Sequence, residues 1–263
     1  MLAFDREGGL WLTHSTPEFP NAPSRPYAGI GGCSASGDCS AQHGQLRFGQ
    51  SFMCVSLGLD VLDGLASAIK TAAPVIASWR LISGIEMPGI RALVNAWESR
   101  AVRVVRKVSW RSFASVDGQG FLYTVKSPTP HGQATYLYEE VLEPLLGDSL
   151  LVQSWSNVES ECSRDGTAVT MTVAEMAFPE GTSWRAGFSD HSKWAVTGHS
   201  DIAMVCMADL NRDGLDPEWS EGPDRPQSLR GGGATCLQHP TLWAAMRGAI
   251  ASTQPCVFAS SEA

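Results

Sequence analysis

The residues best suited to chemistry in this chain are a histidine and a lysine two positions apart, His191 and Lys193. Residues 194–197 have the composition of a β-strand, and if the strand includes the pair, both side chains face the same side. An imidazole can attack phosphorus or protonate a leaving oxygen, while a fixed ammonium neutralises the non-bridging oxygens of a phosphodiester. The pattern therefore predicts a phosphodiesterase site, although such triplets also occur on solvated surface strands.

A second polar segment, Ala208-Asp209-Leu210-Asn211, follows the apolar run 202–207. A His-x-Lys strand followed by a strand that ends near Gly-Ser-x-Asn resembles the phospholipase D superfamily. The asparagine there orients the phosphate or the histidine, which makes Asn211 a candidate site residue. Ala208 and Asp209 depart from the usual Gly and Ser.

Further segments give a closer match. The stretch from Trp11 to Pro20 resembles the Trp-Leu-x-His-Ser-x-Pro-x-Phe-Pro signature of the deoxyribonuclease II family. Other segments resembling that family occur in family order between residues 2 and 256, at 48–56, 110–114, 151–155, 190–194, 209–212, 230–233 and 242–243. The chain therefore resembles a deoxyribonuclease II.

The resemblance implies an α/β, phospholipase D-like layered fold, with mixed β-sheets flanked by helices in two pseudo-symmetric halves and one site at their junction. Residues 1–135 would be the remainder of the first half, and residues 136–263 the second half with the His-x-Lys motif. Apolar patterns agree with mixed α/β structure. They predict strands at 1–4, 10–15, 52–57, 102–110, 150–155, 168–178, 193–197 and 202–209, and helices at 61–79 until Pro74, 136–146 and 239–250. Residues 16–47 and 213–233 have loop composition, and Glu139 and Glu140 are expected to be exposed.

The start of the chain suggests an incomplete first half. In the family, a first His-x-Lys precedes the first strand by a few residues, whereas this sequence has the motif only at 191–193. Cys54 would normally pair with a cysteine upstream of Met1. We expect an N-terminally truncated chain, whose activity depends on whether the missing histidine is essential.

The resemblance implies an acid, metal-independent endonuclease that hydrolyses DNA to 3′-phosphate ends through a phosphohistidine-type intermediate, with no cofactor and no metal. One histidine is the nucleophile and another the general acid and then base; the sequence leaves open which of these His191 is. The implied catalytic residues are His191, Lys193, His14 and Asn211, and the implied substrate-binding residues are Ser15, Asp190 and Arg230. From the residues alone, His14 also fits a core histidine, Asp190 the end of a turn, and Arg230 with its three glycines a flexible turn.

The seven cysteines show no zinc-ligand spacing. The resemblance implies the disulfides Cys206–Cys236 and Cys162–Cys256, each contributing about 3–5 kcal/mol by restricting the unfolded chain. Cys33 and Cys39 lie in a Gly/Ser-rich loop and can pair with each other. The implied location is lysosomal or secreted, although no signal peptide and no glycosylation sequon are visible. No run of 18 apolar residues predicts a membrane span.

A net charge of −8 opposes binding to a polyanion at neutral pH. Acidification protonates carboxylates and the six histidines, which removes this repulsion. A basic cluster is a candidate DNA groove or, alternatively, a solvated face; it consists of Arg100, Arg103, Arg106, Lys107 and Arg111. The expected partner is DNA, and a homodimer is also compatible with the resemblance.

Three other functions were weighed. Asp209 to Gly214 resembles the first half of a calcium loop, but Ser220 stands where a bidentate glutamate is needed. The main alternative is a truncated or degenerate paralogue that binds nucleic acid without cleaving it. A superfamily phosphodiesterase acting on lipid is the third.

Overall fold

The computed structural model describes residues 1–16, 48–76, 78–99, 107–130, 133–155, 160–161, 168–186, 190–213 and 226–257. Within them, a three-stranded antiparallel sheet has the order β1-β2-β3, and a nine-stranded mixed sheet has the order β13-β8-β6-β10-β11-β12-β5-β4, with β9 paired to β8. The strands are β1 Leu2–Phe4, β2 Gly9–His14, β3 Phe52–Leu57, β4 Val108–Ala114, β5 Gly120–Lys126, β6 Leu150–Gln153, β7 Ser160–Glu161, β8 Thr170–Ala177, β9 Ser183–Arg185, β10 Trp194–Thr197, β11 Met204–Ala208, β12 Gly232–Gln238, β13 Ile250–Thr253 and β14 Cys256–Val257.

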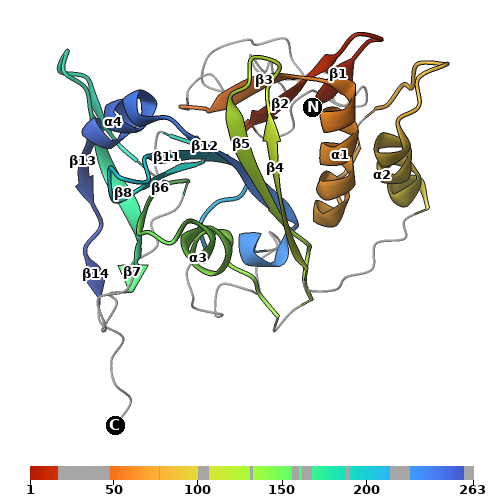
Figure 1. Ribbon diagram of the computed structural model, residues 1–263. Helices are drawn as coiled ribbons and strands as arrows, with labels where there is room; N and C mark the ends of the chain where they lie inside the picture. Colours follow the sequence, from red (N-terminus) through yellow and green to blue (C-terminus); the bar gives the residue numbers. More distant parts are fainter. Residues whose placement is uncertain are drawn as a thin grey trace, which may run out of the picture.

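Helices cover the sheet from different sides (Figure 1). The helices α1 and α2 pack side by side near β4, whereas α4 packs on β10, β11 and β13. The helical elements are α1 Leu59–Ile69, η2 Lys70–Ala72, α2 Pro88–Glu98, η3 Leu137–Leu142, α3 Glu143–Leu146, η5 Gln227–Leu229 and α4 Pro240–Gly248. The predicted α/β class, a mixed sheet flanked by helices, is confirmed.

Strand β10 is the element that leads directly out of the His-x-Lys motif, and it is buried on both faces. It pairs antiparallel with β6 on one side and with β11 on the other. Trp194 and Val196 belong to the hydrophobic cluster that includes α4, whereas Ala195 belongs to the cluster on the η3 side. This alternation follows from the two-residue period of a strand. The motif is therefore anchored to the centre of the sheet.

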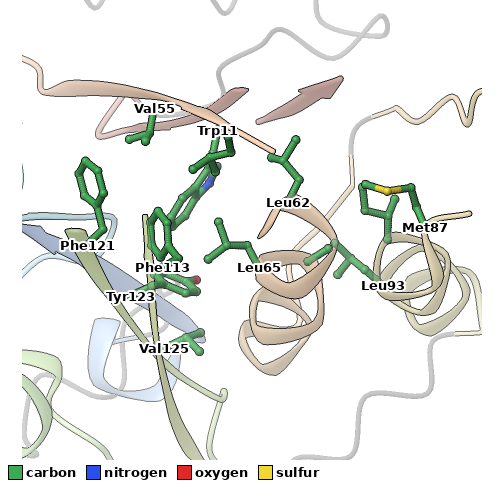
Figure 2. Close-up of a cluster of buried hydrophobic side chains, with 13 residues drawn as sticks. Trp11, Val55, Leu62, Leu65, Met87, Leu93, Phe113, Phe121, Tyr123 and Val125 are labelled. Atoms are coloured by element: carbon green, nitrogen blue, oxygen red, sulfur yellow. The ribbon is translucent and has the colours of Figure 1, made fainter. Parts of the chain in front are cut away.

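A separate hydrophobic cluster joins the three-stranded sheet to α1, α2 and the β4–β5 end of the large sheet. Figure 2 shows Trp11 from β2 among Phe113, Tyr123 and Leu65. The rings of Trp11 and Tyr123 meet edge to face, with their centroids 4.8 Å apart, a favourable geometry for aromatic pairs. Because Trp11 and Val55 bury nearly all of their surface here, the small sheet is held firmly against the large one.

The predicted strand at 52–57 is confirmed without change, and the helix beginning near residue 61 ends at Ala73, before Pro74, in a left-handed backbone conformation. The predicted helix 136–146 is irregular, because its first part, η3, has π-helical hydrogen bonding. The expected exposure of Glu139 is wrong: its side chain is 20% exposed and pairs with Arg212 Nε at 2.6 Å. Sequence patterns missed α2 and the strands β5, β7, β9, β12, β13 and β14.

The proposed division at residue 135 stays a prediction. Strands β4 and β5, which precede this position, are the last two strands of the nine-stranded sheet and pair through β12 with strands that follow it. The large sheet thus crosses the proposed boundary. Among the described residues, no helix is both long enough and apolar enough to cross a bilayer.

The Cys206–Cys236 disulfide is confirmed. The two cysteines lie opposite each other on β11 and β12, with their Cα atoms 3.9 Å apart. Cys162 lies outside the described residues, so its pairing with Cys256 stays a prediction, as does pairing between Cys33 and Cys39, which also lie outside them. Pairing of β14 with β7 places the backbone of Cys256 beside that of Ser160. Cys54 is exposed and carries a free thiol.

Candidate active site

His191 and Lys193 lie in the segment immediately before β10, which begins one residue later than the predicted strand at 193–197 and does not include the His-x-Lys pair. Both residues are nearly buried, with 5% and 7% of their surfaces exposed. The Lys193 ammonium donates a 2.9 Å hydrogen bond to the backbone carbonyl of His191. The structure therefore brings the two residues together, but through the main chain of His191.

Asp190 fixes the conformation of this segment. Its Oδ1 accepts a hydrogen bond from the Ser192 N–H at 2.8 Å, and its Oδ2 accepts one from the Trp184 indole at 3.3 Å. Its backbone forms an isolated parallel bridge with Gly49, and the His191 N–H donates to the Gly49 carbonyl at 2.8 Å. A Cβ atom on Gly49 would lie 2.6 Å from Asp190 Oδ1, so only glycine fits there. Asp190 thus acts on the site by positioning its neighbours.

Lys193 is held by residues from the N-terminal part of the chain. Its N–H donates to Ser51 Oγ at 3.3 Å, and its ammonium reaches the Ser15 carbonyl at 3.5 Å. Burial lowers the pKa of the Lys193 ammonium to about 8, although the nearby Asp209 and Asp190 carboxylates act in the opposite direction. Lys193 is therefore a cation throughout the acidic and neutral pH range.

His14 and Ser15, predicted from the resemblance, lie at the end of β2 beside Lys193. Burial lowers the pKa of the His14 imidazole, and the positive charges of the chain's amino terminus and of Lys193 lower it further. The Ser15 hydroxyl donates to Gln50 Oε1 at 2.7 Å and accepts from the Ser51 N–H at 2.9 Å. The hydroxyl of Ser15 is thus engaged within the protein, while its carbonyl faces the ammonium.

Asp209, at the end of β11, is a charged residue of the site to which sequence reasoning assigned no role. Its Oδ1 accepts a 2.7 Å hydrogen bond from the Gly233 N–H. Although Asp209 as a whole residue is exposed, burial of its carboxyl group raises the pKa to about 6, against the effects of the Gly233 hydrogen bond, Lys126 and Lys193. Asp209 therefore changes charge between acidic and neutral pH.

Asn211 and Arg230 lie in an adjoining region around Lys126. The buried Lys126 ammonium donates to the carbonyls of Gln227, Ser228 and Arg230. Asn211 lines a cavity of about 10 Å³ there, and its Oδ1 has no hydrogen-bond partner among the described residues. The charges of both Lys126 and Lys193 act on Asp209, so it lies near both this region and the His-x-Lys segment.

The glycines after Arg230 do not form a flexible turn. Gly232 and Gly233 begin β12, and the Gly233 N–H is bonded to Asp209. A Cβ on Gly233 would lie 2.2 Å from the Thr124 carbonyl oxygen, so the small residue is needed for close strand packing. The glycines therefore allow close packing of β12 in the sheet and supply a backbone N–H to the Asp209 carboxylate.

Two aromatic residues that sequence reasoning had placed only in family-like segments contact the His191 ring. Phe48 stacks on it with ring centroids 3.9 Å apart and planes inclined by 12°, and Trp155 lies 4.2 Å away at 34°. Two rings cannot share one face at such distances, so Phe48 and Trp155 lie on opposite faces of the imidazole. The ring is held in place by these contacts, and their only sequence signal was the family resemblance.

The arrangement combines an immobilised imidazole, a second imidazole, a buried ammonium and a carboxyl group that titrates near pH 6. Such a set can bind a phosphate group and transfer protons to and from it. In the basic cluster, Arg100, Arg103 and Arg106 lie outside the described residues, while Lys107 and Arg111 are exposed. No three His, Cys, Asp or Glu side chains gather as metal ligands in the part of the chain that the structure describes.

Comparison with known proteins shows the family of the chain. The sequence model of deoxyribonuclease II matches residues 1–256. The chain is 30% identical over 272 residues to deoxyribonuclease-2-alpha of Rattus norvegicus, covering 97% of the chain and 66% of that protein. It is 26% identical to cell-death-related nuclease 7 of Caenorhabditis elegans, covering 98% of the chain and 63% of the relative. It is also 26% identical to plancitoxin-1 of Acanthaster planci, covering 97% and 64%. The chain thus spans slightly less than two thirds of the length of these relatives, and it belongs to the deoxyribonuclease II family.

Proposed function

We propose that this protein hydrolyses phosphodiester bonds of DNA at acidic pH, without a metal, and leaves 3′-phosphate ends. The observation that carries the proposal is that the Lys193 ammonium contacts the carbonyls of His191 and of Ser15, the residue that follows His14 at the end of β2. Family membership and the names of the relatives support DNA as the substrate. Lys193 supplies the positive charge that stabilises the transferring phosphoryl group.

The proposed reaction has two steps that use two imidazoles. In the first step, a neutral imidazole nitrogen attacks phosphorus, the P–O5′ bond breaks, and O5′ takes a proton from the second, protonated imidazole. In the second step, water attacks phosphorus, the N–P bond breaks, and the second imidazole accepts the proton of the water. His191 supplies one imidazole, and His14 is a second one within the electrostatic influence of Lys193. Either assignment of the two roles balances the reaction.

The charges at the site favour acidic pH. Lys193, with a pKa of about 8, is protonated there, and Asp209, with a pKa of about 6, becomes neutral. Both states favour an approaching phosphodiester anion. The lowered pKa of His14 keeps this imidazole neutral to more acidic pH than usual, so it can act as a base or nucleophile where Lys193 is fully charged.

The second candidate function is binding of nucleic acid without cleavage. It is favoured by one observation, the single His-x-Lys motif at residues 191–193. If a second motif of this kind is essential for the first step, the chain binds the phosphodiester and stops there.

Nicking of a supercoiled plasmid at about pH 5 in EDTA separates the two functions. Cleavage with 3′ ends that a polymerase extends only after phosphatase treatment supports the proposal. We expect His191→Ala to lower the rate by at least about 10³-fold, the scale for a lost nucleophile or acid. The matched control is His199→Ala, because this histidine is 77% exposed and pairs with Asp148 instead. A wild-type protein that binds the plasmid but leaves it intact supports the second function, and a fully active His191→Ala variant refutes the role of His191.

The proposed location is a lysosome or the extracellular space. The Cys206–Cys236 disulfide supports it, because disulfides persist mainly in oxidising compartments. An acidic compartment would also provide the pH at which Asp209 loses its charge.

A further inference from the structure

Trp155 combines two properties that rarely occur together. Its ring lies 4.2 Å from that of His191, in the centre of the site, yet 52% of its surface is exposed. Trp155 is the second residue after β6, and the intervening Ser154 hydroxyl accepts a hydrogen bond from the backbone N–H of Arg212 at 3.0 Å, which anchors the chain at this point. The indole is therefore a fixed aromatic surface that faces both the imidazole and solvent.

If Trp155 only packed against the His191 ring, its indole would not need to be exposed to solvent. Phe48, on the other face of the imidazole, is only partly exposed and stacks more closely, with 3.9 Å between ring centroids. The exposed indole surface of Trp155 is available for stacking with a partner. Aromatic side chains next to a phosphate site commonly provide stacking surfaces for nucleic-acid bases.

The contact of Trp155 with His191 identifies the partner. A phosphodiester that contacts His191 and Lys193 carries a base one sugar away on either side. One of these bases is therefore within reach of the indole that contacts His191.

We propose that Trp155 is a base-stacking subsite for the nucleotide next to the scissile phosphate, and that this nucleotide is unpaired when bound. The inference rests on the proposed function for the location of the phosphate. In a duplex, both faces of a base are covered by its neighbours, so a base can stack on Trp155 only after leaving the helix.

Two oligonucleotides test the stacking contact directly. Both are short single strands in which a CH₂ group replaces the O5′ atom at one linkage, so that the bond broken in the proposed reaction is absent. One carries normal bases, and the other lacks the bases on both sides of that linkage. Binding of each is measured by fluorescence anisotropy at about pH 5 with the wild-type chain, Trp155→Ala and Trp155→Phe. Trp110→Ala is the matched control, because Trp110 is an exposed tryptophan, 63% exposed, on β4.

We expect base removal to weaken binding to the wild type by about 5-fold to 150-fold, the range for one base–aromatic stack of about 1–3 kcal/mol. Trp155→Ala should weaken binding of the normal strand by a similar factor and show no further loss when the bases are removed. Trp155→Phe should recover part of the loss, and Trp110→Ala should behave as the wild type. A purely structural effect on His191 would instead weaken both oligonucleotides equally.

The inference is overturned if base removal has the same effect on the wild type and on Trp155→Ala, or if the wild type binds neither oligonucleotide. Plasmid nicking is scored separately. Binding that depends on Trp155 in a protein that does not nick DNA leaves the inference standing and removes the proposed function. Nicking by a protein whose binding does not depend on the bases removes the inference and leaves the proposed function standing.

Discussion

Replacing Asp209 with asparagine removes a negative charge near Lys193 but keeps the oxygen that accepts the Gly233 N–H. The charged groups that act on the Asp209 carboxyl are Lys126 and Lys193, and two buried tyrosines, Tyr123 and Tyr138, have their pKa values raised by it. In the wild type, an ionised Asp209 repels an approaching phosphodiester. We therefore predict that Asp209→Asn strengthens DNA binding at neutral pH and leaves it unchanged at acidic pH.

The size of the effect follows from the pKa of about 6. At pH 5, about one Asp209 carboxyl in eleven is ionised, and at pH 7 about ten in eleven are. If the neutral form binds DNA, the ratio of association constants, variant over wild type, rises from about 1 at pH 5 to about 10 at pH 7. A carboxylate about 6–8 Å from a phosphate, at an effective dielectric constant of about 20, is repelled by about 2–3 kcal/mol, or about 30-fold to 100-fold. The ratio of association constants at pH 7 is thus limited by the ionised fraction of the Asp209 carboxyl, and not by the strength of its repulsion of the phosphate.

The assay is anisotropy with the non-cleavable oligonucleotide, at several pH values from about 5 to about 7. Taking the ratio at each pH cancels titrations that both proteins share. Higher pH is avoided because Lys193 has a pKa of about 8, and loss of the Asp209 charge lowers it further. Asp213→Asn is the matched control: burial also raises the Asp213 pKa, but Lys126 and Arg230 are the cations that act on it. A flat ratio for Asp209→Asn, or an equal rise for Asp213→Asn, would refute the reasoning.

Three further predictions concern stability and are measured by urea unfolding. Gly231→Ala should destabilise the fold by about 2 kcal/mol or more, because its Cβ would lie 2.0 Å from a carbonyl oxygen of η2, whereas Gly248→Ala, with no atom within 4 Å, should be nearly neutral. Arg212→Met should remove about 3–5 kcal/mol, because it leaves a largely buried carboxylate without its cation; a loss below about 1 kcal/mol would contradict this. Replacing both Cys206 and Cys236 with alanine should remove about 3–4 kcal/mol, since the disulfide closes a separation of 30 residues, and an unchanged midpoint would show that the unfolded chain is already compact.

Local patterns identified the elements whose own residues determine their structure. The alternating strand β3 and the apolar strand β10 were predictable, because their periodicity matches burial on one or both faces. The hypothesis that the strand also includes His191 is wrong, because the Asp190 side chain bonds to the backbone two residues on and keeps this segment out of β10. Such side-chain bonds compete with the ladder of a sheet. They cannot be recognised from the hydrophobic pattern.

Other features depend on contacts between distant parts of the chain. Glu139 looks like a solvated helix residue in sequence, but Arg212, 73 positions away, draws it into an ion pair at 2.6 Å. The glycines before Ala234 suggest a loop, since glycine is disfavoured in strands. They form the start of β12 because Thr124 and Asp209 approach too closely for any side chain. Single-sequence patterns carry no information about either approach.

The same dependence explains why the site cannot belong to the His-x-Lys segment alone. The Lys193 ammonium contacts the carbonyl of Ser15, 178 positions earlier, its N–H donates to Ser51, and the His191 N–H donates to Gly49. All three partners come from the part of the chain that carries the small sheet, which packs through Trp11 against the end of the large sheet. Loosening that packing would free His191 and Lys193 together, because the backbone N–H groups of both residues are bonded to residues 49–51. The chemistry of the His-x-Lys motif therefore depends on the docking of the N-terminal strands, even for a reaction in which no N-terminal side chain takes part.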